Sequence, residues 1–151
     1  MADVSYLSKY PPFRGFDKSD FEALGAVGRE KNFKKDDLIF DEDSQGDSMY
    51  IVKVGSVKII RKVKGRENTI AALNAGEFFG EMALLDGLPR SAAVRTIEDT
   101  EVFMIPAEGY QALRRDKPHT ALKVMDIIIK VLSNRLRQAN KNLEVISFWI
   151  D

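Results

Sequence analysis

The sequence contains no cysteine and only one histidine among its 151 residues. Without thiols it has no disulfide, no thiolate nucleophile and no cysteine-ligated zinc or iron–sulfur site, and a single imidazole excludes a metal centre built from several histidines. Long apolar runs are also missing: the Ile-Ile-Ile stretch at 127–129 lies between Asp126 and Lys130, far short of the roughly 18 apolar residues of a membrane span. The first residues carry neither the basic nor the apolar region of a secretory signal. We therefore expect a cytoplasmic protein without a bound metal or a membrane segment.

An excess of charge of one sign is absent too. The 23 lysine and arginine residues are balanced by 23 aspartate and glutamate residues, so the formal net charge is zero. No global field draws such a protein to nucleic acid or to an anionic membrane. Hydrophobic residues make up 44% of the chain and charged residues 30%, an ordinary balance for one folded domain of this length.

What the sequence does contain is a series of short β-type segments. Closely spaced short strands separated by turn signals predict a sandwich or barrel. At least six such segments lie at 38–40, 49–52, 57–60, 69–73, 92–96 and 102–105. Helices are expected on either side: Asp17 and Asp20 form a capping pattern before an N-terminal helix, and Pro118 lies where a long C-terminal helix begins.

Apolar residues recur along this C-terminal helix in alternating steps of three and four, the pattern of a coiled-coil seam. The seam comprises Leu122, Met125, Ile129, Leu132, Leu136, Ala139, Leu143, Ile146 and Ile150. In the first half, Val124, Ile128 and Val131 add a second stripe. The helix could fold back on its own domain or pair with a second copy in a parallel homodimer. The sequence favours the homodimer, because nine seam positions exceed what one barrel face can cover.

The most informative segment is 76–93, which reads as a turn, a short apolar helix, a loop and a strand. Gly80 lets a ligand approach the main chain, and the first turn of the helix offers free N–H groups to an anion. Pro89 limits where Arg90 can point, and Arg90 presents a planar fork of donors that fits phosphate oxygens. Glu81 accepts hydrogen bonds from hydroxyls. This combination suits a phosphorylated ribose; the structural alternative is an ion pair between Glu81 and Arg90 in an empty pocket.

The segment resembles the phosphate-binding cassette of the cyclic nucleotide-binding domain family, and the resemblance extends to Lys34–Lys58 and to the helices at both ends. The sequence is most similar to the sensor domain of bacterial cyclic AMP receptor-type regulators. The resemblance implies a mainly β fold: an eight-stranded β-roll, a jelly-roll-like double-stranded β-helix, with an N-terminal helix and a long C-terminal helix. It implies one domain over 1–151, with a helical part at 1–33, the β-roll at 34–105 and helices at 106–148.

The resemblance also implies a set of ligand-binding residues. Glu81 would accept from the ribose 2′-hydroxyl, Arg90 would pair with the cyclic phosphate, and Ser91 would join backbone N–H groups in the phosphate cradle. On the long helix, Arg135 would reach Glu81 or the ligand, and Asn140 would contact the base. The whole predicted set is Gly80, Glu81, Met82, Ala83, Arg90, Ser91, Ala92, Arg135 and Asn140.

Three departures from the family pattern stand out. Asp36 and Asp43 occupy positions where the family often has glycine, so two early turns must use aspartate, which tolerates left-handed geometry better than most residues. Ala139 cannot hydrogen-bond a base. The bacterial regulators continue into a helix-turn-helix domain, and the sequence contains no segment that could form one, so we expect no direct DNA binding.

The predicted function is a regulatory sensor that binds cAMP, or cGMP, and changes helix and dimer geometry on binding. Ser91 in place of threonine leans towards cAMP. The signal would pass to another protein, whose identity the sequence does not name. Two alternatives are a degenerate, ligand-free dimerisation module and a fragment of a larger transcription regulator. An enzyme is disfavoured, because metal-dependent barrels need several histidines and no Gly-x-Ser-x-Gly elbow is present.

Overall fold

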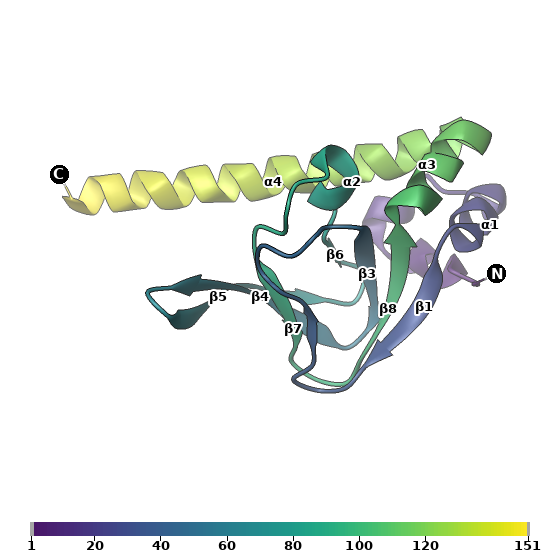
Figure 1. The fold of residues 1–151 in the computed structure, drawn as a ribbon. Helices are drawn as coiled ribbons and strands as arrows, with labels where there is room; N and C mark the ends of the chain where they lie inside the picture. Colours follow the sequence, from purple (N-terminus) through teal and green to yellow (C-terminus); the bar gives the residue numbers. More distant parts are fainter. Residues whose placement is uncertain (1, 151) are drawn as a thin grey trace.

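In a computed structural model of the chain, two antiparallel four-stranded sheets form a β-roll with helices at one side (Figure 1). The structure describes the backbone of residues 2–150 and the side chains of residues 2–82 and 84–143. The eight strands, the N-terminal helix and the long C-terminal helix confirm the predicted fold class.

Each sheet combines strands that are distant in the sequence. The first sheet has the order β1 (Arg29–Phe33), β8 (Thr100–Pro106), β3 (Ser48–Val54) and β6 (Phe78–Phe79). The second has the order β2 (Leu38–Phe40), β7 (Ala93–Thr96), β4 (Ser56–Val63) and β5 (Arg66–Asn74). The connections between strands therefore cross repeatedly from one sheet to the other, as in a jelly roll.

The helices lie before, within and after the roll. They are the 3₁₀ turns η1 (Ser5–Lys9) and η2 (Pro11–Phe13) and the α-helices α1 (Lys18–Ala26), α2 (Met82–Asp86), α3 (Ala107–Asp116) and α4 (Pro118–Ile150). Helix α1 begins with a capping box in which Asp17 and Asp20 each accept from the other's backbone N–H, as the sequence predicts. Helix α4 begins at Pro118, also as predicted. Along the described chain, none of the helices combines the length and the hydropathy needed to cross a lipid bilayer.

Strand β1 lies inside the part of the chain that was expected to be helical, so the sheets begin at Arg29 rather than at residue 34. Its sequence, REKNF, is polar, and its side chains are exposed or half-buried at the edge of the first sheet. Such an edge strand needs no apolar alternation, since only one of its sides is paired and little of it is buried.

The first half of α4 is built into the core. Val124 and Ile128 are buried together with Ala121 and Ile127, in the cluster between the first sheet and the helices. Val131 packs against the same cluster. The second apolar stripe of the helix therefore faces the domain.

The coiled-coil seam of α4 behaves differently. Four of its residues lie seven apart and are largely exposed: Leu122 (61%), Ile129 (57%), Leu136 (62%) and Leu143 (62%). Met125 and Leu132 are half-buried against the core, while the side chains of Ile146 and Ile150 lie outside the described residues. The distal part of α4 and the β4–β5 hairpin project from the same side of the roll (Figure 1).

Candidate functional site

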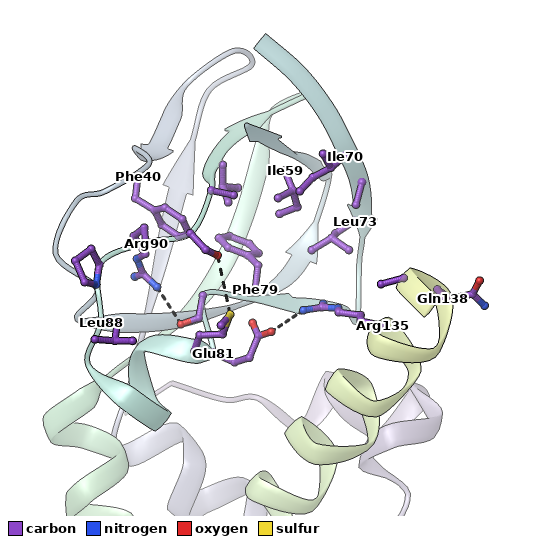
Figure 2. Close-up of a pocket in the computed structure, with 18 of the residues that line it drawn as sticks. Phe40, Ile59, Ile70, Leu73, Phe79, Glu81, Leu88, Arg90, Arg135 and Gln138 are labelled. Atoms are coloured by element: carbon purple, nitrogen blue, oxygen red, sulfur yellow. Dashed lines mark hydrogen bonds and ion pairs between the residues drawn. The ribbon is translucent and has the colours of Figure 1, made fainter. Parts of the chain in front are cut away.

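A cavity of about 670 Å³ lies between the roll, α2 and α4 (Figure 2). Its apolar wall comes from five strands, with Phe40 on β2, Ile59 on β4, Ile70 and Leu73 on β5, Phe79 on β6 and Val94 on β7. Strands β4 and β5 are paired, with Ile59 opposite Ala71 and Val57 opposite Leu73. This pairing brings the β4 and β5 residues of the wall next to one another. The polar residues of the wall come mainly from segment 76–93 and from α4.

Arg90 lies in this wall with only 6% of its surface exposed. Its Nη1 donates to the carbonyl oxygen of Gly80 at 2.9 Å, and its Nη2 donates to that of Ser48 at 2.6 Å. The guanidinium also lies over the ring of Phe40, 3.9 Å from the centroid, and 4.0 Å from the Asp47 carboxylate. These contacts fix the orientation of the fork before any ligand arrives.

The electrostatics of Arg90 favour an anion. Burial lowers the pKa of its guanidinium, against the opposing effects of Tyr50, Asp47 and Glu81, but an arginine stays protonated at neutral pH. Its Nε is buried and has no hydrogen-bond partner. A buried, charged donor without an acceptor is costly, and an anion that accepted a hydrogen bond from it would relieve that cost.

Gly80 makes this packing possible. It has a φ of +78°, and a Cβ placed there would lie 2.8 Å from Nη1 of Arg90 and 3.0 Å from the carbonyl oxygen of Ser48. A side chain at this position would be strained and would displace the guanidinium. The sequence predicts that a ligand approaches the main chain closely at Gly80. In the structure the group that approaches it is the guanidinium of Arg90.

Glu81 is also buried, at 3% exposure, and its partner comes from α4. Arg135 donates from Nη1 to Glu81 Oε1 at 2.6 Å and from Nη2 to the carbonyl oxygen of Phe78 at 2.8 Å. Figure 2 shows Arg135 and Arg90 on opposite sides of Glu81. Among the described residues, the ion pair of Glu81 is therefore with Arg135, and the alternative of a pair with Arg90 is wrong.

The remaining cassette residues fall around the same cavity. Met82, Ser91 and Ala92 line it, and the Ser91 hydroxyl lies 4.0 Å from the Met82 sulfur. The side chain of Ala83 lies outside the described residues. Helix α2 has only five residues, so its aligned peptide dipoles are few and the positive charge offered to an anion in this segment is mainly that of Arg90.

Asn140 does not belong to the cavity of its own chain, which corrects the prediction for this residue. The α4 residues that line the cavity are Asn134, Arg135, Gln138, Ala139 and Asn142. Successive helix residues are rotated by about 100°, so Asn140 is turned away from the face that carries Arg135 and Asn142. The sequence did not single out Gln138 and Asn142, although their i, i+4 spacing places them on one helix face.

Residues whose side chains are described include no group of three or more histidine, aspartate or glutamate residues arranged to hold a metal ion. The chemistry of the site is that of a binding pocket: an apolar wall, one buried carboxylate, one buried guanidinium and a hydroxyl. Such a constellation can hold an anionic, hydroxyl-bearing ligand with an apolar or aromatic part.

Comparisons with known proteins find relatives that cover most of this chain. The chain is 34% identical to the Cyclic AMP receptor protein of Thermus thermophilus over 139 residues. These residues make up 91% of this chain and 62% of that protein. It resembles the crystal structure of Thermus thermophilus Catabolite Activator Protein with a TM-score of 0.79 and 35% identity, covering 91% of this chain and 63% of that one. It also resembles the regulatory domain of Toxoplasma gondii PKA crystallised with cAMP (TM-score 0.62, 25% identity), covering 67% of this chain and 39% of that one.

The chain thus spans less than two thirds of the length of the bacterial relative. A family model described as "Cyclic nucleotide-binding domain" matches residues 30–117. This range contains the strands around the cavity and the whole of segment 76–93, with the buried Glu81 and Arg90. The chain therefore belongs to the cyclic nucleotide-binding domain family.

Proposed function

We propose that this domain is a regulatory sensor whose ligand is cAMP, with cGMP as the competing candidate. The observation that carries the proposal is the buried guanidinium of Arg90, oriented by two carbonyl oxygens and left with an unpartnered Nε–H, in the same cavity as the buried carboxylate of Glu81. Relatives that match this chain are named for cAMP, which supports the choice of ligand.

Each part of the ligand has a matching part of the cavity. The cyclic phosphate is held by Arg90, the Ser91 hydroxyl and backbone N–H groups of Gly80 and Ala92. The ribose hydroxyl donates to Glu81. The base lies against the apolar wall of β4 and β5, since stacking and apolar contact suit a purine ring.

Binding is coupled to helix α4 through Glu81. In the structure this carboxylate accepts from Arg135, which ties the cassette to α4 at 2.6 Å. A ribose hydroxyl that donates to Glu81 changes the strength and geometry of that contact. The sensor therefore reports ligand binding as a shift of α4 relative to the roll.

The exposed seam of α4 supports homodimerisation as part of the proposal. Four large apolar side chains repeat every seven residues along one side of the helix and are more than half exposed in the single chain. A shift of α4 would then alter the dimer, and a downstream protein would read the change. The cytoplasmic location stays a prediction.

The test is binding of nucleotides to the purified chain. Isothermal titration calorimetry and thermal melting are carried out with cAMP, cGMP and cyclic dinucleotides, since a ligand stabilises the folded state by RT ln(1 + [L]/Kd). Arg90→Ala should weaken cAMP binding by about 2–5 kcal/mol, because the desolvated phosphate loses its counter-charge. Arg61→Ala is the matched control: the Arg61 side chain is exposed on β4 and lies outside the cavity lining.

Three results separate the alternatives. Heat of binding and a rise in melting temperature with cAMP, with the nucleotide recovered unchanged, support the sensor. Neither signal with any cyclic nucleotide supports a ligand-free dimerisation module and overturns the proposal. Conversion of cAMP to the linear monophosphate indicates a phosphodiesterase instead.

A further inference from the structure

The sulfur atoms of this chain are distributed unevenly between core and cavity. The sequence has no cysteine and five methionines. Met49 and Met104 are 2% and 4% exposed in the core, and Met125 is half-buried on α4. Met82 is 48% exposed. Among the methionines whose side chains the structure describes, Met82 is thus the one that a dissolved oxidant reaches freely.

Met82 also occupies a sensitive place. It is the first residue of α2, directly after Glu81, and it lines the cavity together with Arg90 and Ser91. Its sulfur lies 4.0 Å from the Ser91 hydroxyl oxygen. A thioether is a weak acceptor, so it leaves this hydroxyl available to another acceptor in the cavity.

We propose that Met82 is an oxidative modification site that weakens ligand binding when a peroxide converts it to the sulfoxide. The sulfur lone pair attacks the peroxide, the O–O bond breaks, and one oxygen forms a new bond to sulfur. The sulfur is oxidised by two electrons, and hydrogen peroxide is reduced to water. This inference rests on the proposed function, because its effect is exerted on a ligand in the same cavity.

The expected effect follows from the change in polarity. A sulfoxide is polar where the thioether was apolar, and its oxygen is a much better acceptor for the Ser91 hydroxyl. The cyclic phosphate then loses the Ser91 hydroxyl as a donor. The electronegative sulfoxide oxygen also lies beside the phosphate and repels it. Met82 therefore lets the cavity sense oxidant although the chain has no thiol to do so.

The first test locates the modification. The folded protein is treated with limiting hydrogen peroxide, and tryptic peptides are analysed by mass spectrometry over time. The peptide 67–90 contains Met82 as its only methionine. It should gain one oxygen atom before the peptides that contain Met49, Met104 or Met125. Oxidation of any of these three ahead of Met82 would overturn the inference.

The second test measures the consequence. For each protein the Kd of cAMP is compared before and after the same peroxide treatment. In the wild type it should rise at least about tenfold, equivalent to one hydrogen bond to a charged group. Treatment with methionine sulfoxide reductase should then reverse the change. Met82→Leu should show no further change on peroxide treatment, whatever its starting affinity, whereas Met125→Leu should respond as the wild type does.

The two proposals fail in different ways. If untreated protein binds cAMP and oxidation at Met82 leaves the Kd unchanged, the modification site is wrong and the sensor stands. The same holds if Met82→Leu loses affinity as the wild type does. If untreated protein binds no cyclic nucleotide, both proposals fall together.

Discussion

At the scale of single residues, Arg90 has two tasks at once. Arg90 donates from its two terminal nitrogens to the carbonyl oxygens of Ser48 and Gly80, and its guanidinium lies over the ring of Phe40. It thereby joins β3 to the cassette and keeps its charge in the wall of the cavity. A planar, five-donor group can serve both tasks, whereas a single ammonium cannot replace its geometry.

Arg90→Lys is therefore expected to weaken cAMP binding at least about tenfold, even though the positive charge is retained. The lysine ammonium has to choose between the two carbonyl oxygens and the phosphate. Calorimetric titration gives the Kd, and Arg61→Lys, at an exposed position of β4, serves as the control, with no expected change. Wild-type affinity in Arg90→Lys would show that the fork is not needed.

A second residue-scale prediction concerns the turn beside the site. Asp43 has a φ of +65°, and its N–H donates to the carbonyl oxygen of Arg90 at 2.8 Å. Left-handed backbone is costly for residues with a Cβ, although aspartate tolerates it better than most. Asp43→Gly should raise the free energy of unfolding by about 0.5–1 kcal/mol, measured by urea denaturation. Asp43→Ala keeps the Cβ and should bring no gain; equal stability of the two variants would contradict the strain.

These residues also show what sequence can predict at this scale. The left-handed turns at Asp36 and Asp43 were predicted correctly, because backbone conformation there depends on local chemistry. The acceptors of Arg90 were not predicted, since Ser48 is 42 positions away and reaches it only through the pairing of strands. The error at Asn140 has a similar cause: one residue of helix rotation, fixed by distant packing, decides which side chains face the cavity.

At the scale of elements, a buried aspartate ties α1 to α4. Asp20 accepts from the Thr120 hydroxyl at 2.6 Å and from the Lys123 ammonium, and it is 3% exposed. Burial acts to raise its pKa, but the hydrogen bonds from Lys123, Thr120 and the Asp17 N–H, together with the positive charge of Lys123, outweigh burial and lower the pKa from 3.8 to about 2. The ionised carboxylate is therefore stabilised in the folded state.

The sign of the pH dependence follows from this shift. Because the folded pKa is lowered, the contribution of Asp20 is fully present above about pH 4 and is lost as the pH falls towards 2. The gap of nearly two pH units corresponds to about 2 kcal/mol of unfolding free energy. Urea denaturation of wild type and Asp20→Asn between pH 6 and pH 2 measures it.

The wild type should lose about 2 kcal/mol more than Asp20→Asn over this range, and the variant should be the less stable protein at pH 6. Asp116→Asn, on the exposed end of α3, is the control and should follow the wild type. Parallel pH profiles for wild type and Asp20→Asn would show that Asp20 does not link the two helices through its charge.

Elements differ in how well the sequence predicts them. Segments with strong apolar character, such as β3 and β8, were predicted, and so were the starts of α1, which has a capping box, and of α4, which begins at a proline. Strand β1 and the two-residue β6 were not, because both are strands through the partners that pair with them rather than through their own composition. The apolar wall of the cavity depends on the same long-range pairing, so its members could not be chosen from the sequence.

At the scale of the whole molecule, the distal half of α4 runs past the cavity, and its C-terminal turns extend beyond the body of the roll (Figure 1). Along it the only large apolar side chains that the structure describes, Leu136 and Leu143, are each 62% exposed. A single helix of this length with an exposed apolar stripe gains stability by packing against a second helix, and the spacing of seven is that of a left-handed coiled coil. Two copies of α4 side by side would bury the exposed stripe of each copy against that of the other.

Leu136→Glu should therefore convert a homodimer into monomers, because it places a charge in the middle of the stripe of each helix. Sedimentation velocity over a range of protein concentrations measures the change, and Lys130→Glu is the control, since it adds the same side chain at an exposed position off the stripe. The monomeric variant should keep the fold and still bind cAMP through Arg90 and Glu81. Ligand binding should, however, no longer change its sedimentation coefficient. If the wild type stays monomeric at every concentration, no second α4 covers the exposed leucines, and the homodimer is contradicted. If Leu136→Glu remained a dimer, the contact would have to lie elsewhere on the molecule.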